Sequence, residues 1–421
     1  MTQRVEPKPG PGLRAFSALR HVQYRWYWFS GLSMTAAQGI LQLAIAWLVL
    51  DLTGSVGQLG LVVFIQGVPM AIASFYGGVL ADRYNRRNIL VLAQTVTMLD
   101  LTALAILTAG DMVQIWHVYL SSIGLGLMQA VTMPARNALI RSLVDESDML
   151  NAVALNAVQF HSSRIIWPSL AGGLITLAGV GVTLGLSAAC SFSGIVFLLM
   201  IRKLKDDGEA HPVRSSQFRQ MAEGVRYAFT EPGVATVMLL SLCCGLFGLS
   251  YMNLAPAFAR EELELGASGA GFFMMSMGVG AIVGSALLLV FPVKDGRQLF
   301  ITLTAGFGIV ILTQAVNPWF PAAFVVMGLF GLVSAVLVVA GQTFLQINVP
   351  QHLLGRLVGL WSLAGGLGFI TALPIGLLGD EVGLRWSMGG AAALLIVSTV
   401  WFGFVSQRER RVAEEATPAA S

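Results

Sequence analysis

Twelve long apolar runs occupy most of this 421-residue chain, and each is long enough to cross a membrane. A helix of about 20 apolar residues spans the hydrocarbon core of a bilayer. The runs lie at residues 26–50, 58–81, 89–109, 113–138, 152–178, 182–201, 234–259, 269–292, 299–316, 321–346, 357–379 and 387–406. The sequence therefore predicts an all-α membrane protein with twelve transmembrane helices.

Charged residues are too scarce to cover a water-soluble surface. They form 11% of the chain and hydrophobic residues form 56%, whereas soluble domains usually carry about 25% charged residues. The lipid bilayer is therefore the expected surrounding, and we expect a monomer with no nucleic-acid partner. The three cysteines all lie in apolar runs, and two of them, Cys243 and Cys244, are adjacent. This pattern predicts small buried side chains rather than a metal site.

Basic residues indicate the orientation. If the N-terminus is cytoplasmic, all but three of the 25 lysines and arginines fall on the cytoplasmic side. The exceptions are Arg164, which lies inside a run, and Arg260 and Arg385, which lie outside beside acidic residues. Because cytoplasmic loops are enriched in Lys and Arg, we predict that both termini are cytoplasmic.

A polar break at residues 203–233 divides the chain. Apolar residues recur at helical spacing in its second part, which predicts an amphipathic helix on the inner membrane face. We expect cytoplasmic segments at 1–25 and 407–421, a six-helix bundle at 26–202 and a second one at 234–406. Segments 139–153 and 344–358 can be aligned with each other. Two pseudo-symmetric six-helix repeats are typical of rocker-type secondary transporters.

The turn between the second and third runs, GGVLADRYNRRNIL (77–90), concentrates four charged residues in a chain that has few. Its order G-x-x-x-D-R-x-N-R-R resembles the loop signature of the major facilitator superfamily. Three further segments resemble the branch that holds enterobactin exporters, macrolide efflux pumps and related drug:proton antiporters: FSALRHVQYRWYWFSG (16–31), MPARNALIRSLVDESDMLNAVALN (133–156) and SRIIWPSLAGGLI (163–175). The resemblance covers nearly the whole chain. It implies the two-bundle transporter fold and a location in the bacterial plasma (inner) membrane.

The resemblance also implies a cytoplasmic gate at this turn. It assigns the gating motif to Gly78, Asp82, Arg83, Asn85, Arg86 and Arg87. Asp82 would bridge to the N-terminal end of the eleventh helix, near Arg356, where unsatisfied amides attract a carboxylate. The arginines would hold acidic residues of the loop at 145–148. The alternative is that these charges only fix the topology.

Two positions depart from the family pattern. Asn85 stands where the signature usually has glycine, and asparagine tolerates the left-handed conformation better than most residues, so we expect the turn to survive. Trp167 stands before Pro168 where the branch has glycine, and an indole there changes the packing or the cavity shape. The arginine found within the fourth helix of many drug:proton antiporters is absent.

Asp100 and Arg164 are the two clear charges inside the runs. At about 1.5 Å per residue, each lies about 18–20 Å from the inner edge. Because charges in hydrocarbon pair or line a cavity, three roles stay open. They are an ion pair between the two, a protonation switch at Asp100, and a contact for an anionic substrate at Arg164. His161 shares a face with Arg164, and is either a proton relay or a hydrogen-bonded structural side chain.

Two helices supply candidates for a substrate cavity. Gln38 and Gln42 recur with Thr35 at helical spacing in the first helix, which lines the cavity in this fold. Polar contacts between helices are the alternative role. In the eighth helix Phe273 and Met277 belong to FFMMSM (272–277). These side chains either offer a soft surface to an apolar ligand or pack against the core or lipid.

Together these features predict a secondary active transporter that exports a small amphiphilic molecule, drug- or siderophore-like, by alternating access. We expect protons as the coupled ion, a proton gradient as the energy source and no cofactor. The alternative is a lysolipid or lipid transporter, or a flippase, on the same fold. HExxH, GxSxG and Walker motifs are absent, which argues against an enzyme and against a nucleotide-driven pump.

Overall fold

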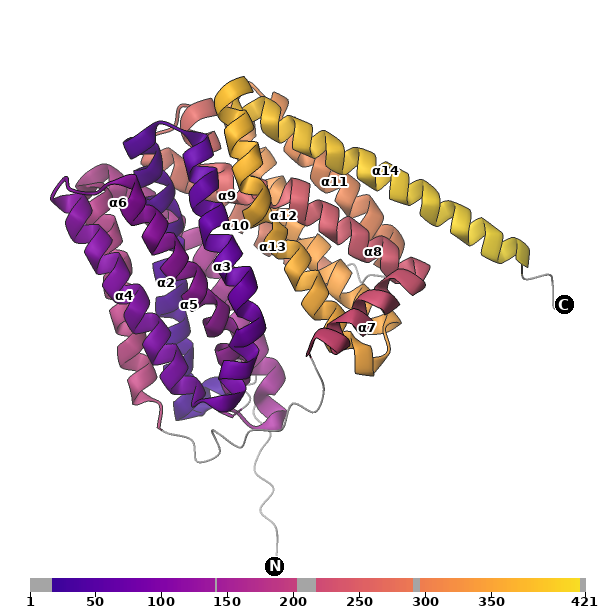
Figure 1. Cartoon of the computed structure of the whole chain (residues 1–421), viewed down its shortest axis with the longest axis horizontal. Helices are drawn as coiled ribbons and strands as arrows, with labels where there is room; N and C mark the ends of the chain where they lie inside the picture. The colour runs from indigo at the N-terminus through magenta and orange to yellow at the C-terminus, as the bar shows by residue number, and fades with distance from the viewer. Residues whose placement is uncertain (1–16, 141, 203–216, 291–295, 417–421) are drawn as a thin grey trace, which may run out of the picture.

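The computed structural model describes residues 17–140, 142–202, 217–290 and 296–416. These residues form helices and turns, with no β-strand in the described ranges (Figure 1). The N bundle comprises η1 (Ser17–Arg20), α2 (Val22–Thr53), α3 (Val56–Arg83), α4 (Arg86–Ala109), α5 (Ile115–Ile140), η2 (Glu146–Asp148) and α6 (Met149–Met200). Helix α7 (Gln217–Thr230) precedes the C bundle. The C bundle comprises α8 (Pro232–Cys243), η3 (Cys244–Gly248), α9 (Ser250–Ala257), η4 (Phe258–Glu262), α10 (Ala267–Val290), α11 (Gly296–Val316), α12 (Phe320–Asn348), α13 (Gln351–Val382) and α14 (Leu384–Ala416).

Helix α6 contains two of the predicted crossings. A continuous helix of 52 residues would be about 78 Å long, far longer than a hydrocarbon core of about 30 Å. Gly179 breaks it with φ 83° and ψ 171°. The chain reverses there, because both ends of α6 meet the start of α2. Tyr24 donates its hydroxyl to the carbonyl of Ala152 at 2.9 Å, and the amide of Arg202 donates to Gln23 Oε1 at 2.8 Å.

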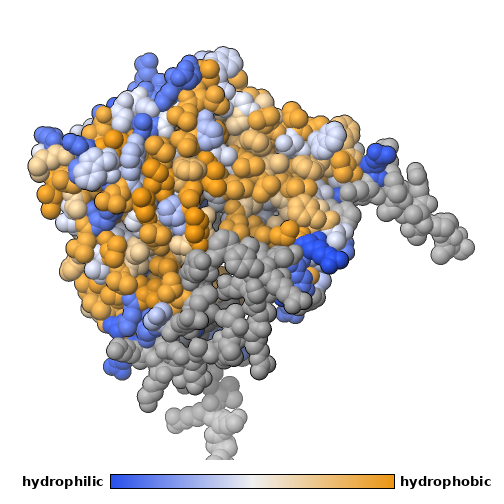
Figure 2. Space-filling model, viewed as in Figure 1, coloured by the Kyte–Doolittle hydropathy of each residue, from blue (hydrophilic) through white to orange (hydrophobic). Residues whose placement is uncertain are grey.

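Eleven helical segments in the described residues are long and apolar enough to cross a membrane, α6 being counted once. One of them, Gly233–Glu262, includes α8, α9 and two π-helical turns, η3 and η4. With α6 as a hairpin, these segments agree with the predicted all-α membrane fold. The apolar residues that face outward also fit lipid, because Leu92, Leu99 and Ile106 repeat every seven residues along α4 and are 59–65% exposed. Figure 2 shows hydrophobic residues over most of the visible face.

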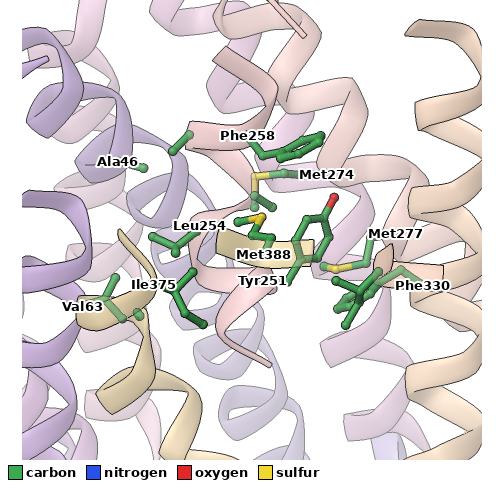
Figure 3. Close-up of a cluster of buried hydrophobic side chains, with 14 of the residues drawn as sticks. Ala46, Val63, Tyr251, Leu254, Phe258, Met274, Met277, Phe330, Ile375 and Met388 are labelled. Carbon is green, nitrogen blue, oxygen red and sulfur yellow. The ribbon is translucent and has the colours of Figure 1, made fainter. Parts of the chain in front are cut away.

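The two bundles meet at one end and diverge toward the other (Figure 1). We call the end with turns 53–56 and 382–384 the closed end, and the end with η1, η2 and α7 the linker end. A continuous apolar core crosses from one bundle to the other. In Figure 3 Ala46 and Val63 of the N bundle lie beside Leu254 and Ile375 of the C bundle.

Glycines let the backbones of the two bundles touch. A β-carbon on Gly60 of α3 would lie 2.4 Å from the carbonyl oxygen of Ala372 in α13. A β-carbon on Gly271 of α10 would lie 2.5 Å from the carbonyl oxygen of Pro168 in α6. Small residues permit this close approach between membrane helices, so no other side chain fits at these points without moving a helix.

The same packing inside the C bundle generates a stability prediction. A β-carbon on Gly280 of α10 would lie 1.8 Å from the carbonyl oxygen of Gly328 in α12, whereas one on Gly306 of α11 meets no atom within 4 Å. We expect Gly280→Ala to lower the thermal unfolding midpoint of the detergent-purified protein, because overpacking costs about 1–3 kcal/mol. Gly306→Ala, the matched control, should not lower it. Equal midpoints for the two variants would contradict the helix contact.

Candidate functional site

A cavity of about 380 Å³ lies at mid-depth between the two bundles. Helices α2 to α6 form most of its wall, and α9, α10 and α13 close the opposite side. Gln38 is exposed although it lies within the transmembrane helix α2. An exposed amide at this depth is satisfied by water or by a ligand rather than by lipid, so the cavity is the candidate binding site.

Three of the four predicted cavity residues line this space. Gln38 and Gln42 face it from α2, and Met277 faces it from α10. The prediction for Phe273 is wrong, because this ring is fully buried in the C bundle, against Phe258 and Phe324. Phe273 shares a face of α10 with Met277, one turn along, but its ring is taken up by the aromatic contacts with Phe258 and Phe324 and does not reach the cavity.

Three glutamines in the cavity wall were not predicted. Gln66 of α3, Gln94 of α4 and Gln129 of α5 join the pair on α2. The sequence carried a signal for them, because an amide within an apolar run needs a partner that lipid does not supply.

An ion pair between Asp100 and Arg164, one of the three roles that the sequence leaves open, does not form. Asp100 of α4 accepts a hydrogen bond from the hydroxyl of Ser121 in α5, at 2.6 Å. Arg164 of α6 lines the cavity, and its Nη2 donates to Met252 Sδ of α9 at 3.0 Å. Similar depth did not bring the two charges together, because the helices present them to different sides.

Helix α6 also carries His161, whose side chain lies outside the described part of the structure. Two residues further along α6, Ser163 donates its hydroxyl to Thr35 Oγ1 at 2.7 Å and so joins α6 to α2. Thr35 therefore serves as a polar contact between helices, while it also lines the cavity. Among the described residues, no three His, Cys, Asp or Glu side chains gather as a metal site requires.

The side chain of Trp167 in α6 fits because α2, the helix that faces it, has a glycine at the point of contact. A β-carbon on Gly39 of α2 would lie 2.7 Å from Cβ of Trp167. The glycine that the branch has before Pro168 is thus replaced here by a glycine opposite the indole. The contact of α6 with α10 remains close, since Gly271 still meets the carbonyl of Pro168.

The gating motif is only partly described. Gly78, Asp82 and Arg83 belong to α3 by backbone, but their side chains lie outside the described residues, and so does the expected bridge from Asp82. Asn85 corrects one expectation, because its φ of −57° is not left-handed. It is the N-cap of α4, and its side chain accepts from the amide of Asn88 at 3.1 Å. An N-cap favours asparagine as strongly as a left-handed turn does.

Arg87 holds a helix end rather than loop acids. Its Nε and Nη2 donate to the carbonyls of Leu198 and Leu199, both at 2.8 Å. These are among the last carbonyls of α6, where a cation also offsets the negative end of the helix dipole. Arg86 makes an interaction of its own.

The other linker-end partners also differ from expectation. The loop acid Asp148 accepts from the hydroxyl of Ser17 at 2.5 Å and lies 2.9 Å from His21 Nε2, which fastens η1 and the start of α2 to the turn before α6. Arg356, expected near Asp82, donates to Glu223 Oε2 of α7 at 2.6 Å. Helix α7 is thereby attached to the C bundle.

At the closed end a carboxylate joins the two bundles. Asp380 of α13 accepts from the amide of Val56 at 2.7 Å and from the amide of Gly57 at 3.0 Å. The hydroxyl of Ser55 donates to the same carboxylate at 2.5 Å. These are the first amides of α3, which have no partner within the helix, so Asp380 caps a helix that belongs to the other bundle.

A cation forms the second junction at the closed end. Arg260 Nη1 of η4 donates to Asp51 Oδ1 of α2 at 2.6 Å, and its guanidinium lies 4.9 Å from the ring of Trp47. Arg385 remains within the C bundle, where it binds Glu262 at 2.8 Å. The sequence placed these charges outside the apolar runs, but it did not indicate which acid each arginine would meet.

The chain matches known proteins over almost its whole length. A family model described as "Transmembrane secretion effector" matches residues 13–419. The chain is 26% identical over 390 residues to the enterobactin exporter EntS of Escherichia coli O1:K1 / APEC, which covers 90% of this chain and 91% of that protein. It is 26% identical over 363 residues to EntS of Salmonella choleraesuis (strain SC-B67), with 85% of each chain covered.

Solved structures share the fold at low identity. The nucleoside transporter NupG superposes with a TM-score of 0.67 at 14% identity, covering 90% of this chain and 98% of that one. A bacterial homologue of the human lysosomal transporter Spinster gives 0.70 at 13% identity, covering 95% and 98%. The protein is therefore a multi-pass membrane transporter rather than an enzyme. It belongs to the transmembrane secretion effector family, within the major facilitator superfamily.

Proposed function

We propose that this transporter is a secondary active exporter of a small amphiphilic molecule, drug- or siderophore-like, that works by alternating access. The observation that carries the proposal is the mid-depth cavity, which both bundles line and which polar contacts close off at one end. The curated relatives named as enterobactin exporters support export as the direction of transport.

The charge distribution supports the orientation in this proposal. Arg87, Arg202 and Arg356 lie at the linker end, whereas Arg260 and Arg385 at the closed end are both paired with acidic residues. The enrichment of cytoplasmic loops in Lys and Arg supports a cytoplasmic linker end, with both termini, and a closed end on the outside. In a bacterial inner membrane, the conformation described here would load substrate from the cytoplasm.

The cross-bundle contacts are consistent with that state. Among the described residues, the hydrogen bonds between the bundles run from mid-depth, at Arg164, through Thr176 and Ser268, to the closed end. Opening the cavity to the outside would require the bonds of Asp380 and Arg260 to break. We therefore propose that these two junctions form the outer gate, while the gating motif near Asp82 acts at the cytoplasmic side.

Packing between the bundles favours a small molecule over a lipid. A lipid flippase would need a lateral opening between α6 and α10 or between α3 and α13. Gly271 and Gly278 of α10 lie against the backbone of α6, and Gly60 and Gly67 lie against α13. The bundle interface is thus closed to an acyl chain at these levels. The lysolipid or lipid transporter, or flippase, is therefore the second candidate, behind the small-molecule exporter.

Proton coupling is part of the proposal, with Asp100 as the coupling residue. Asp100 and its partner Ser121 lie behind the cavity wall. The residues that follow them in the chain, Leu101 and Ser122, both line the cavity. A carboxyl in hydrocarbon is costly when charged. Protonation would change its bond to Ser121 and thereby the α4–α5 contact beside the substrate. His161 remains a second candidate for the relay.

Transport into proteoliposomes tests the coupling. We expect an imposed pH gradient to drive accumulation of a transported drug or siderophore by the wild-type protein. Asp100→Asn should abolish the gradient-driven part and leave substrate exchange at equal pH. Asp111→Asn, the same chemical change at the exposed end of α4, is the control and should transport normally. Full coupling in Asp100→Asn would reduce Asp100 to a structural partner of Ser121.

The outer gate can be tested by a distance measurement. Spin labels on Leu52→Cys and Val382→Cys, two exposed positions in different bundles at the closed end, report its opening when the native cysteines are replaced. We expect Asp380→Asn to populate longer distances. An amide nitrogen would then face the α3 amides, and each lost hydrogen bond to a charged group is worth about 1.5–3 kcal/mol. That corresponds to a shift of about tenfold or more in the closed-to-open ratio.

Glu381→Gln supplies the control for the gate. This neighbouring carboxylate is exposed and makes no described hydrogen bond, so its loss should leave the distances unchanged. A distance distribution in Asp380→Asn that matches the wild type would remove Asp380 from the gate.

A further inference from the structure

The cavity wall is divided by chemistry between the two bundles. Among the described lining residues, the N bundle contributes all the hydroxyls, all five glutamines and the arginine. The C bundle contributes the amide of Asn253 and otherwise apolar side chains, Met252, Met274, Met277 and Phe369. A molecule that fills the cavity therefore meets hydrogen-bonding groups on one side and a soft, polarizable surface on the other.

Arg164 sets the sign of the charge that the cavity accepts. It is the one charged side chain among the described lining residues, and no carboxylate lines the same space. The backbone of α6 at Arg164 lies against Gly278 of α10. The side chain of Arg164 is therefore attached to the backbone at the interface between the two bundles. A cation in surroundings of low dielectric constant attracts an anion far more strongly than it would in water.

The contact between Arg164 and Met252 can be exchanged for a ligand. A thioether sulfur is a weak hydrogen-bond acceptor, whereas a guanidinium and a carboxylate form short, strong and often bidentate hydrogen bonds. A carboxylate that enters the cavity would therefore replace Met252 Sδ at the 3.0 Å contact. Because Met252 belongs to the other bundle, this exchange would also remove one of the mid-depth bonds that hold the bundles together.

The remaining polar wall suits an oxygen-rich body. The glutamines at 38, 42, 66, 94 and 129 come from four helices and supply both donors and acceptors. The hydroxyls of Thr35, Thr97 and Thr132 line the same side of the cavity, so this wall is suited to a ligand that both donates and accepts hydrogen bonds.

We propose that the substrate is an amphiphilic organic acid bound in one orientation. Its carboxylate lies at Arg164, its polar body lies along the glutamines of the N bundle, and its apolar face lies on the methionines and Phe369 of the C bundle. The inference rests on the proposed function, because it names the substrate class of the same cavity. In this arrangement the N bundle recognises the polar groups of the substrate, and the C bundle provides an adaptable apolar surface. Binding of the acid would also weaken the contact between the bundles, because it replaces the bond from Arg164 to Met252.

A pair of probes with the same shape tests the assignment. 2-Naphthylacetic acid and its primary amide differ in charge at neutral pH, and binding of each to the purified full-length protein is measured by calorimetry. We expect the wild type to bind the acid at least tenfold more tightly than the amide. Arg164→Gln should abolish this preference without weakening amide binding, and Arg164→Lys should keep part of it. Met252→Leu, which removes the competing sulfur at similar volume, should tighten acid binding only.

Arg136→Gln is the matched control. Arg136 is a buried arginine of α5 that stacks on Tyr27 and does not line the cavity, so its loss should leave the acid preference intact. Equal wild-type affinity for the two probes, binding of neither, or an equal loss of both in Arg164→Gln would overturn the proposal. Transport of substrates with no Arg164-dependent preference for acids would refute the substrate class alone. Arg164-dependent acid binding without any transport would instead refute the proposed function.

Discussion

Hydrocarbon offers no hydrogen bonds, and this constraint decides where every polar group of the protein can lie. Charged side chains at the ends of the helices hold helix termini, as Arg87 and Asp380 do. Arg164 and five glutamines within the helices line one space between the bundles. Because lipid cannot form hydrogen bonds with the glutamine amides, these side chains face a shared cavity in which water or a ligand can bond to them.

The bundle interface combines contacts of two kinds. Glycines such as Gly60 and Gly271 bring helix backbones together without any polar bond, and such surfaces can slide or separate at modest cost. The junctions of Asp380 and Arg260 are directional and sit at the closed end. Smooth packing at mid-depth and discrete polar bonds at one end give an interface that favours one closed arrangement while leaving the bundles free to rock as units.

The two bundles have different roles in the proposed mechanism, because their cavity walls differ in chemistry. The N bundle holds Arg164 and the glutamine wall, while the C bundle presents methionines and Phe369. A substrate held by hydrogen bonds to one bundle can stay attached while the apolar surface of the other bundle moves across it, because apolar contacts are not directional. The bond from Arg164 to Met252 connects this recognition to the relative position of the bundles.

The sequence by itself determined the membrane class, the helical crossings, the superfamily and two cavity glutamines, because apolar length and charge position are properties of a linear chain. Only the tertiary structure decided the partners. Asp100 and Arg164 share a depth but not a neighbour, and Phe273 points into the core. Trp167 fits because Gly39 faces it from another helix. Such contacts depend on the rotation of each helix about its axis and on which helices are adjacent. The spacing of residues along a single apolar run determines neither of these.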